Sequence, residues 1–213
     1  MKAIAKIFTF IAFSILTFSS FKDCQAQGAF ESVKIGRQEW MVDNLNVNRF
    51  RNGDAIPEAK TNEEWRKAGE EGRPAWCYYG NDPTNGKKIG KLYNWYAVVD
   101  KRGLAPKGWH IPSEEEFNRL MNSVRFRSRA LKAVGQGSGD ESGTNSSGFS
   151  AILGGMRDES GNFSYINHFT AFWSLISNNN VDIIRLNIYD SAREIDLANT
   201  PAAWGLSVRC VRH

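Results

Sequence analysis

The segment from Leu92 to Val124 carries the strongest folding signal in the chain. Its first part places apolar residues at the spacing of one helix face, namely Leu92, Trp95, Tyr96 and Val99. Glycine and proline residues between positions 100 and 108 then end that helix and stiffen the turn. A second helix is expected from Ser113, because Ser113 and Glu116 have the spacing of a reciprocal capping box. The segment therefore predicts two short amphipathic helices on which strands can pack.

Short strand-like runs lie on both sides of this helix pair. Apolar and alternating residues predict strands near 32–35, 39–42, 75–79, 149–153, 163–176, 182–189 and 204–211. Thr61 and Glu64 form another capping box, and residues 135–148 form a long polar loop. Helices, a long loop and several strands indicate an α+β domain with a mostly antiparallel sheet. We see one domain, residues 31–213, without internal repeats.

The N-terminus has the pattern of a secretory signal peptide over residues 1–26. Lys2 and Lys6 precede an apolar run at residues 7–18, and small residues precede a cut before Gln27. The run is short for a membrane span, so no stable span is expected after cleavage, although an uncleaved anchor is the alternative. Cys24 leaves lipidation open, but residues 21–23 lack the small and aliphatic side chains of a lipobox.

Cleavage at this point changes both the charge and the cysteine count. The formal net charge of +4 falls to +2, and basic residues alternate with acidic ones, which argues against a nucleic-acid partner. Cys77 and Cys210 remain, an even number in an oxidising compartment. We expect a disulfide between them, and two buried free thiols are the alternative.

Several motifs in a fixed order resemble one known family. They are VKIG with Trp40-Met41, GKLYNWYAV at 90–98, GWHIPS at 108–113, SGFSA at 147–151 and GLSVRCVR at 205–212. Together they resemble the Fibrobacter succinogenes major paralogous domain family from about residue 31 to the C-terminus. Members are typically exported proteins of Bacteroidetes and Fibrobacteres, so the resemblance implies a secreted, periplasmic or cell-surface location.

A second likeness concerns the fold. The segment Ile111–Phe117 resembles part of the formylglycine-generating enzyme family. Both families resemble the C-type lectin-like fold, in which two short helices pack on a small, mostly antiparallel sheet and a long loop region carries ligands. The resemblance implies that plan here, and a disulfide at the last strand would fit it. Fold alone assigns no activity.

The residues that could support catalysis are sparse. The formylglycine-generating enzymes use cysteines to hold copper, but a disulfide would occupy both thiols that remain here. His110, His168 and His213 lack the spacing of metal ligands, and no Gly-x-Ser-x-Gly elbow is present. Glu114, Glu115 and Glu116 are best explained by the dipole of the helix they begin. We therefore expect no enzyme and no required cofactor.

Calcium-dependent sugar binding is a weaker possibility. The Glu-Pro-Asn, Gln-Pro-Asp and Trp-Asn-Asp signatures of calcium-binding lectins are missing. Two loops could still supply oxygen ligands, residues 140–145 with Asp140 and Asn145, and residues 178–182 with Asn179 and Asp182. Solvated turns are the alternative at both places.

Aromatic side chains are the better candidates for ligand contacts. Trp40, Trp76, Trp95 and Trp109 lie in core-like runs, whereas other rings lie near loops and could stack on a sugar or anchor a protein partner: Tyr79, Tyr165, Phe172, Trp173 and Trp204. A small aromatic core would also account for them.

The tripeptide Asp190-Ser191-Ala192 resembles the sites of O-glycan attachment in exported Bacteroidetes proteins. Ser191 would then be the glycan acceptor, and an ordinary turn is the alternative.

From the sequence we expect an exported binding or adhesion protein whose ligand is a glycan or an envelope protein. The ligand-binding candidates are Trp173, Trp204, Tyr79, Asn179 and Asp182. Two alternatives remain open. One is a degenerate relative of the formylglycine-generating enzymes with an unrecognised oxidative or hydrolytic activity, and the other is a structural component of the envelope.

Overall fold

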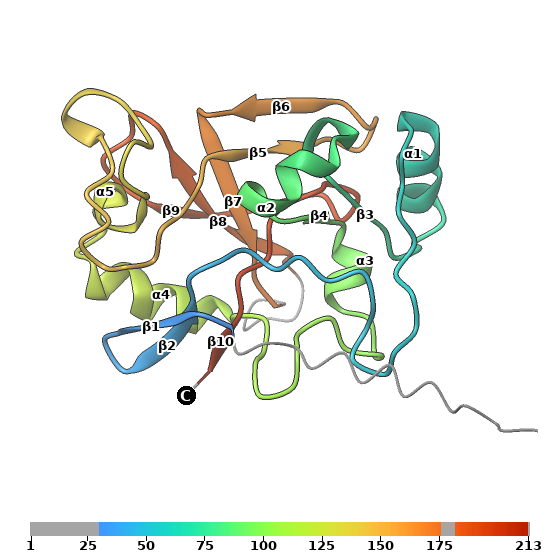
Figure 1. Ribbon diagram of the computed structural model, residues 1–213, viewed down its shortest axis with the longest axis horizontal. Helices are drawn as coiled ribbons and strands as arrows, with labels where there is room; N and C mark the ends of the chain where they lie inside the picture. Colours follow the sequence, from blue (N-terminus) through green and yellow to red (C-terminus); the bar gives the residue numbers. More distant parts are fainter. Residues whose placement is uncertain (1–29, 176–181, 213) are drawn as a thin grey trace, which may run out of the picture.

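The computed structural model describes residues 30–175 and 182–212, which form short helices and three sheets (Figure 1). The α-helices are α1 (Asn62–Glu70), α2 (Gly86–Ile89), α3 (Trp95–Val98), α4 (Glu114–Ser123) and α5 (Ser128–Leu131). The strands are β1 (Ser32–Ile35), β2 (Gln38–Met41), β3 (Trp76–Cys77), β4 (Leu92–Tyr93), β5 (Gly154–Arg157), β6 (Phe163–Ile166), β7 (Phe169–Trp173), β8 (Ile184–Tyr189), β9 (Asp196–Asn199) and β10 (Val211–Arg212). Single 3-10 turns lie at Tyr79–Asn81, Pro83–Asn85 and Gly139–Glu141. The expected signal peptide lies outside the described residues.

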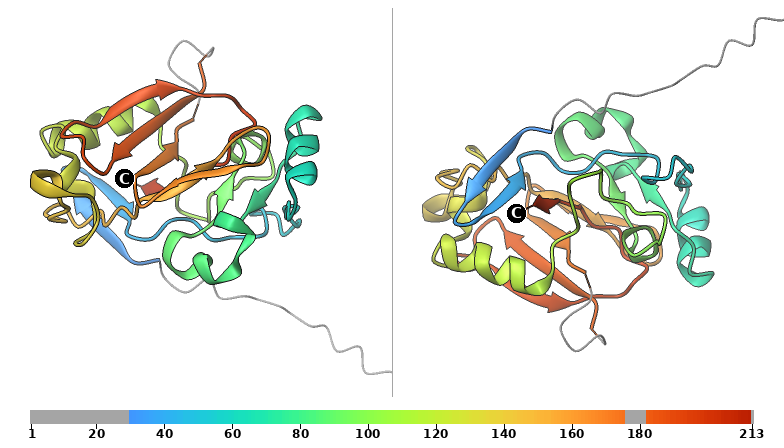
Figure 2. Two further views of the ribbon diagram at one scale, coloured as in Figure 1. Left: turned by 90° about the horizontal axis from the view of Figure 1, so that it is seen from above. Right: turned by 90° about the horizontal axis from the view of Figure 1, so that it is seen from below.

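The sheets are mostly antiparallel, which confirms that part of the predicted α+β architecture. The largest has the strand order β6-β5-β7-β8-β9 and contains one parallel pairing, between β5 and β7. A smaller sheet joins the two ends of the described chain, because β10 pairs with β2 beside β1. Strands β8 and β9 lie on one side of the molecule and β1 on the other, while α1 lies at one end (Figure 2). No helix within residues 30–175 and 182–212 is long and apolar enough to cross a bilayer.

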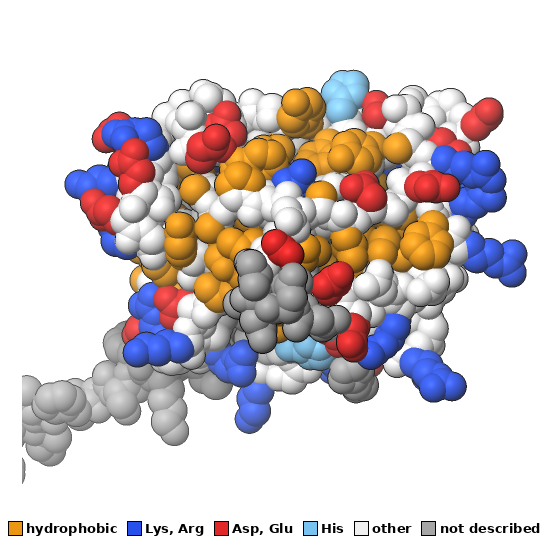
Figure 3. All heavy atoms as spheres, turned by 180° about the vertical axis from the view of Figure 1, so that it is seen from behind, with side chains coloured by type: hydrophobic (Ala, Val, Ile, Leu, Met, Phe, Trp, Pro, Cys, Tyr) orange, Lys and Arg blue, Asp and Glu red, His pale blue; other side chains and the backbone are white. Residues whose placement is uncertain are grey.

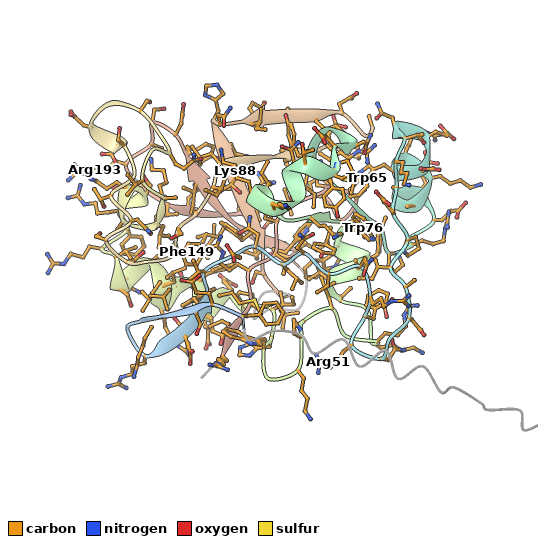
Figure 4. All side chains as sticks on the ribbon, in the orientation of Figure 1. Arg51, Trp65, Trp76, Lys88, Phe149 and Arg193 are labelled. Atoms are coloured by element: carbon orange, nitrogen blue, oxygen red, sulfur yellow. The ribbon has the colours of Figure 1, made fainter. Side chains whose placement is uncertain are left out.

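Two large apolar clusters lie on opposite sides of strand β7 in the five-stranded sheet. Alternation along β7 sends Phe169, Ala171 and Trp173 into one cluster and Phe172 into the other. In the second cluster Trp40 stacks on Phe117 with ring centroids 5.7 Å apart. The four tryptophans assigned to the core from the sequence are all buried. Figure 4 shows the labelled Phe149 and Trp76 inside the molecule.

The second half of the Leu92–Val124 segment folds as the sequence predicts. Ser113 Oγ accepts a hydrogen bond from the Glu116 N–H, and the Glu116 carboxylate accepts one from the Ser113 N–H at 2.8 Å. His110 Nε2 lies 2.7 Å from the same carboxylate. Burial raises the pKa of Glu116, but these hydrogen bonds outweigh it and hold that pKa below its ordinary value. The capping box at Thr61 is also present, at the start of α1.

This cap gives a direct stability test. Ser113→Ala is expected to lower the free energy of unfolding by about 1 kcal/mol, because the Glu116 N–H loses its acceptor at a buried helix start. Ser123→Ala, at the exposed end of the same helix, is the matched control and should change it by less than about 0.5 kcal/mol. Urea unfolding followed by circular dichroism measures both. Equal effects of the two changes would contradict the assigned role of the cap.

The first half of the segment differs from the prediction of a helix over residues 92–99. Leu92 and Tyr93 pair with β3 as strand β4, and only Trp95–Val98 is helical. Asn94 separates the two because its side chain accepts a hydrogen bond from the Ala97 N–H and so caps α3. The apolar residues spaced along 92–99 are therefore buried on two different elements, strand β4 and helix α3. Pairing with β3, a distant segment, makes Leu92 and Tyr93 a strand rather than part of the helix.

The sequence also misplaced the strands around residue 154. We expected a strand at 149–153 that breaks at Gly154-Gly155, but β5 begins at those glycines. A side chain on Gly155 would meet the Ser164 carbonyl oxygen at 2.5 Å and the Tyr79 ring at 2.6 Å, so glycine permits close strand packing here. Strand β9 was missed, and within residues 204–210 the structure forms isolated bridges.

Candidate functional site

Strands β7 and β8 place an aromatic and polar surface on one side of the large sheet. Their antiparallel register sets Phe169 opposite Tyr189 and Trp173 opposite Arg185. Residues directly opposite each other point to the same side of a sheet. Alternation along β8 buries Leu186 and Ile188 on the other side, in the core. We name this surface the aromatic face and define it by Tyr165, Phe169, Arg185, Tyr189 and Trp204.

Three rings form a contiguous row at one end of the aromatic face. The Phe169 ring centroid lies 5.0 Å from that of Tyr189 and 6.2 Å from that of Tyr165. Phe169 is buried, while Tyr165 is 61% exposed and Tyr189 is 36% exposed. Tyr165 holds a left-handed backbone conformation with φ +63°, which is rare for a residue with a side chain. The buried ring thus supports two rings that present apolar surface to solvent.

A charged and hydrogen-bonded network adjoins these rings. Arg185 Nε donates to Asn187 Oδ1 at 2.7 Å, and Asn187 Nδ2 donates to Asp196 Oδ2 at 2.9 Å. The Arg185 guanidinium lies 4.7 Å from the centre of the Trp204 ring, a cation–π contact. Trp204 Nε1 donates to Glu159 Oε2 at 2.5 Å. Figure 3 shows hydrophobic side chains gathered on this back face of the molecule with charged side chains between them.

Burial sets the electrostatics of this face. Partial burial raises the pKa of Tyr189, and the nearby Asp196 raises it further, so the phenol is neutral in neutral solution. Burial lowers the pKa of Arg185, although an arginine starts high enough to stay charged. Beside the face, the hydrogen bond from His168 lowers the pKa of Asp190. The face therefore offers one fixed cation among rings and hydrogen-bonding groups.

His168, Asp190 and Ser191 lie together at the edge of the face, but in an order unlike a catalytic triad. His168 Nδ1 lies 2.9 Å from Asp190 Oδ2, and the Ser191 hydroxyl donates to the other oxygen of Asp190 at 3.0 Å. A hydrolytic triad needs the imidazole between the hydroxyl and the carboxylate. Here the carboxylate lies between them, so these contacts do not activate Ser191 as a nucleophile.

Comparison with known protein families tests the family resemblance that the sequence motifs indicated. A sequence model of the Fibrobacter succinogenes major domain matches residues 33–212. The chain belongs to this family. No curated protein and no solved structure matches it.

One motif of the Fibrobacter succinogenes major domain surrounds a buried arginine. Arg209, in the GLSVRCVR motif, donates from Nε to Asn44 Oδ1 at 3.1 Å and from Nη1 to the Phe149 carbonyl. Its guanidinium also lies 4.3 Å from the centre of the Phe149 ring, which belongs to the SGFSA motif. Motifs that are 60 residues apart in the chain thus meet at one side chain. Their role at this place is structural.

The structure separates the ligand-binding residues predicted from the sequence. Trp204 lies on the aromatic face, and Asp182 accepts a hydrogen bond from Asn199 beside the start of β8. Tyr79 packs against Phe163, with ring centroids 5.2 Å apart, and has no ring contact with Tyr165, Phe169 or Tyr189 among the described residues. Trp173 was wrongly assigned, because it is fully buried and its Nε1 donates to the Tyr93 carbonyl at 2.7 Å. Asn179 lies outside the described residues.

The other aromatic candidates divide in the same way. Tyr165 is exposed as predicted, whereas Phe172 is buried in the core. The sequence did not single out Arg185 and Tyr189. Their signal was nevertheless present, because they alternate with Ile184, Leu186 and Ile188 and therefore lie on the opposite side of that strand.

The expected disulfide is absent. Cys77 and Cys210 are free, buried thiols that belong to different core clusters. Cys77 lies on β3 beside β4, whereas the carbonyl of Cys210 accepts a hydrogen bond from the Met41 N–H near β2. Burial raises the pKa of each thiol to about 12, so neither is a thiolate near neutral pH. The even number of cysteines was therefore misleading.

The loop proposed for calcium uses some of its oxygens internally. Asn145 Oδ1 accepts a hydrogen bond from the Ser150 N–H at 2.8 Å, and Asp140 lies in the exposed turn Gly139–Glu141. Among the described residues no group of three His, Cys, Asp or Glu side chains could hold a metal ion. Calcium binding at Asp140 and Asn145 stays a prediction. O-glycan attachment to Ser191, which is exposed, also stays a prediction.

Proposed function

We propose that this protein is an exported binding protein of the periplasm or cell surface, and that it holds a glycan on the aromatic face without transforming it. The observation that carries the proposal is the row of Tyr165, Phe169 and Tyr189 beside the network of Arg185, Asn187 and Asp196. Rings offer apolar surface to the C–H side of a sugar, and the network offers donors and acceptors to its hydroxyls.

The mixture of groups favours a glycan over a protein partner. Protein interfaces concentrate their binding energy in a desolvated apolar centre with a polar rim. On the aromatic face the polar groups adjoin the rings directly, and Arg185, Asn187 and Asp196 already bond one another, which holds their side chains in place. A rigid array of this kind suits the regularly spaced hydroxyls of a saccharide.

A C-type lectin-like architecture is part of the same proposal. It is supported by the small sheet that joins the first and last described strands, by helices α1 and α4, and by the long segment between α5 and β5. That fold would place a ligand surface on loops and strand ends. The proposal for the aromatic face does not depend on it.

A glycan array with purified protein tests the function. We expect the wild type to bind a set of glycans, and Tyr165→Ala or Trp204→Ala to weaken that binding about tenfold each, because a lost stacking ring costs about 1–1.5 kcal/mol. Val134→Ala is the control, since Val134 is a 78% exposed apolar residue that does not belong to the aromatic face. Thermal unfolding of every variant establishes that each is folded.

Two outcomes would contradict the proposal. An array on which the folded wild type binds nothing would exclude a glycan ligand, and the protein alternative would then take its place. Binding that survives the Tyr165→Ala/Trp204→Ala double change would place the glycan elsewhere on the molecule.

A further inference from the structure

A concave surface lies on another part of the molecule, apart from the aromatic face. It is an open hollow of about 840 Å³ between the β1–β2 turn, the end of α4, the start of α5 and the loop at residues 144–147. An adjoining hollow of about 480 Å³ shares Arg125 and Arg127 and adds Phe126, Arg193 and Glu194. Figure 1 shows the β1–β2 hairpin beside α4, and Figure 4 shows the labelled Arg193 at the edge of the molecule near α5. We name the larger one the basic hollow.

The charge of the basic hollow is uniform. Four of its lining residues are cationic, Lys34, Arg125, Arg127 and Arg129, and none of them is acidic. Across residues 30–175 and 182–212, no carboxylate forms an ion pair with any of these four side chains. Other arginines behave differently, since Arg66 and Arg102 pair with neighbouring carboxylates. Four like charges around one concavity repel one another, and a bound anion would relieve that repulsion.

The end of α4 does not need these guanidinium groups. Its final carbonyls accept backbone hydrogen bonds instead, since the Phe126 N–H donates to the Met121 carbonyl at 2.8 Å and the Arg125 N–H to the Asn122 carbonyl at 3.0 Å. Helix capping, the usual task of arginine at this position, therefore does not account for the cluster.

The backbone at this point is strained. Arg125 and Phe126 are consecutive residues with φ +54° and +58°, a conformation that favours glycine or asparagine. Such a conformation is unfavourable for residues with a side chain, and residues that adopt it gather at functional sites. Here the strained pair holds one arginine of the hollow in place and leaves Phe126 42% exposed beside it.

We propose that the basic hollow binds the acidic groups of an anionic polysaccharide, carboxylate or sulfate. Arginine matches both groups with two parallel hydrogen bonds, and three of the four cations are arginines. The hollow is of the size of a ligand site. Its hydroxyl groups suit a saccharide: Ser123, Thr144 and Ser147 each donate to a backbone carbonyl and keep lone pairs for sugar hydroxyls.

The same features argue against a nucleic acid as occupant. Single-stranded nucleic acids need rings interleaved with cations along a groove, whereas the twelve residues that line the basic hollow include no aromatic one and Phe126 is a single ring beside it. The site goes beyond the function proposed for the aromatic face and does not require it, because the two surfaces share no residue.

Binding assays with the whole chain test the proposal. We use polygalacturonate for carboxylates, chondroitin sulfate for sulfates, dextran as the neutral polymer and single-stranded DNA as the rival polyanion. We expect binding of one or both acidic polysaccharides, no binding of dextran at this site, and weakening by salt. Arg127→Gln/Arg129→Gln should weaken acidic polysaccharide binding about tenfold or more, and Arg127→Lys/Arg129→Lys should weaken it less, because charge is kept but paired hydrogen bonds are lost.

The controls separate this site from general charge and from the aromatic face. Lys87→Gln/Lys88→Gln removes two exposed charges from α2, outside the hollow, and should leave the affinity within about twofold. Arg127→Gln/Arg129→Gln is also made in the Tyr165→Ala/Trp204→Ala background, where it should still weaken acidic polysaccharide binding about tenfold or more, so the two proposals can fail separately. An equal loss in the α2 variant, tighter binding of DNA than of either polysaccharide, or no binding of either polysaccharide by the folded wild type would each overturn the proposal.

Discussion

Arg209→Ala is expected to lower the free energy of unfolding by about 3–5 kcal/mol. The guanidinium is buried and donates to Asn44 Oδ1 and to the Phe149 carbonyl, so its removal leaves both oxygens without a donor. An unsatisfied buried acceptor costs about 1–3 kcal/mol, and the cavity adds to this. Release of a poorly solvated charge offsets part of the loss, since burial lowers the pKa of Arg209 to about 9. Urea unfolding measures the difference.

Two further variants divide this effect. Arg209→Met fills most of the cavity, so the destabilisation that it retains reports the two unsatisfied oxygens. Arg37→Ala, at the exposed β1–β2 turn, removes the same side chain without burial and should change stability by less than about 0.5 kcal/mol. If Arg209→Met is as stable as the wild type, the hydrogen bonds of this arginine do not stabilise the fold.

Trp173→Ala is expected to lower the free energy of unfolding by about 3–5 kcal/mol as well. The indole is fully buried, lies 5.4 Å from the Trp95 ring between centroids, and donates from Nε1 to the Tyr93 carbonyl. The loss of a whole buried ring leaves a large cavity in the core. Thermal or urea unfolding of the variant provides the measurement.

Trp204→Ala is the comparison, because it removes the same side chain from a half-buried position at the edge of the core. That change should cost less stability than Trp173→Ala and should also reduce glycan binding. Trp173→Phe should fall between the wild type and alanine, since it keeps a ring but loses the indole N–H. A Trp173→Ala variant within about 1 kcal/mol of the wild type would contradict the assignment of Trp173 to the core.

The sequence predicted correctly those features that depend on interactions between residues close together in the chain. The capping boxes at Thr61 and Ser113 join residues three positions apart, so neighbours in the chain define them completely. The strands near 32–35 and 39–42 and strand structure within residues 163–173 also appeared as expected. The apolar run at Leu92 failed because β3, more than ten residues away, supplied a ladder that spacing cannot reveal.

The candidate sites needed distant parts of the chain. Trp173 and Trp204 were both predicted to contact ligand, and only packing against Trp95 and the Tyr93 carbonyl buries the first, while the second lies against Arg185. The basic hollow brings Lys34 beside arginines about ninety residues later, which no local pattern announces. The even number of cysteines does not tell how far apart the two thiols lie in the fold. Strand pairing placed Cys77 and Cys210 in separate core clusters, where they stay free.

The sequence by itself determined the family, the α+β class, the two helix caps and the tryptophans of the core. These depend on motif order, on contacts between near neighbours and on hydrophobicity, all of which a linear chain carries. Only the tertiary structure decided which rings and cations share a surface and which thiols stay apart. Those relations depend on strand register and on the packing of segments that are distant in the chain, because a shift of one residue in a strand moves every side chain to the opposite face.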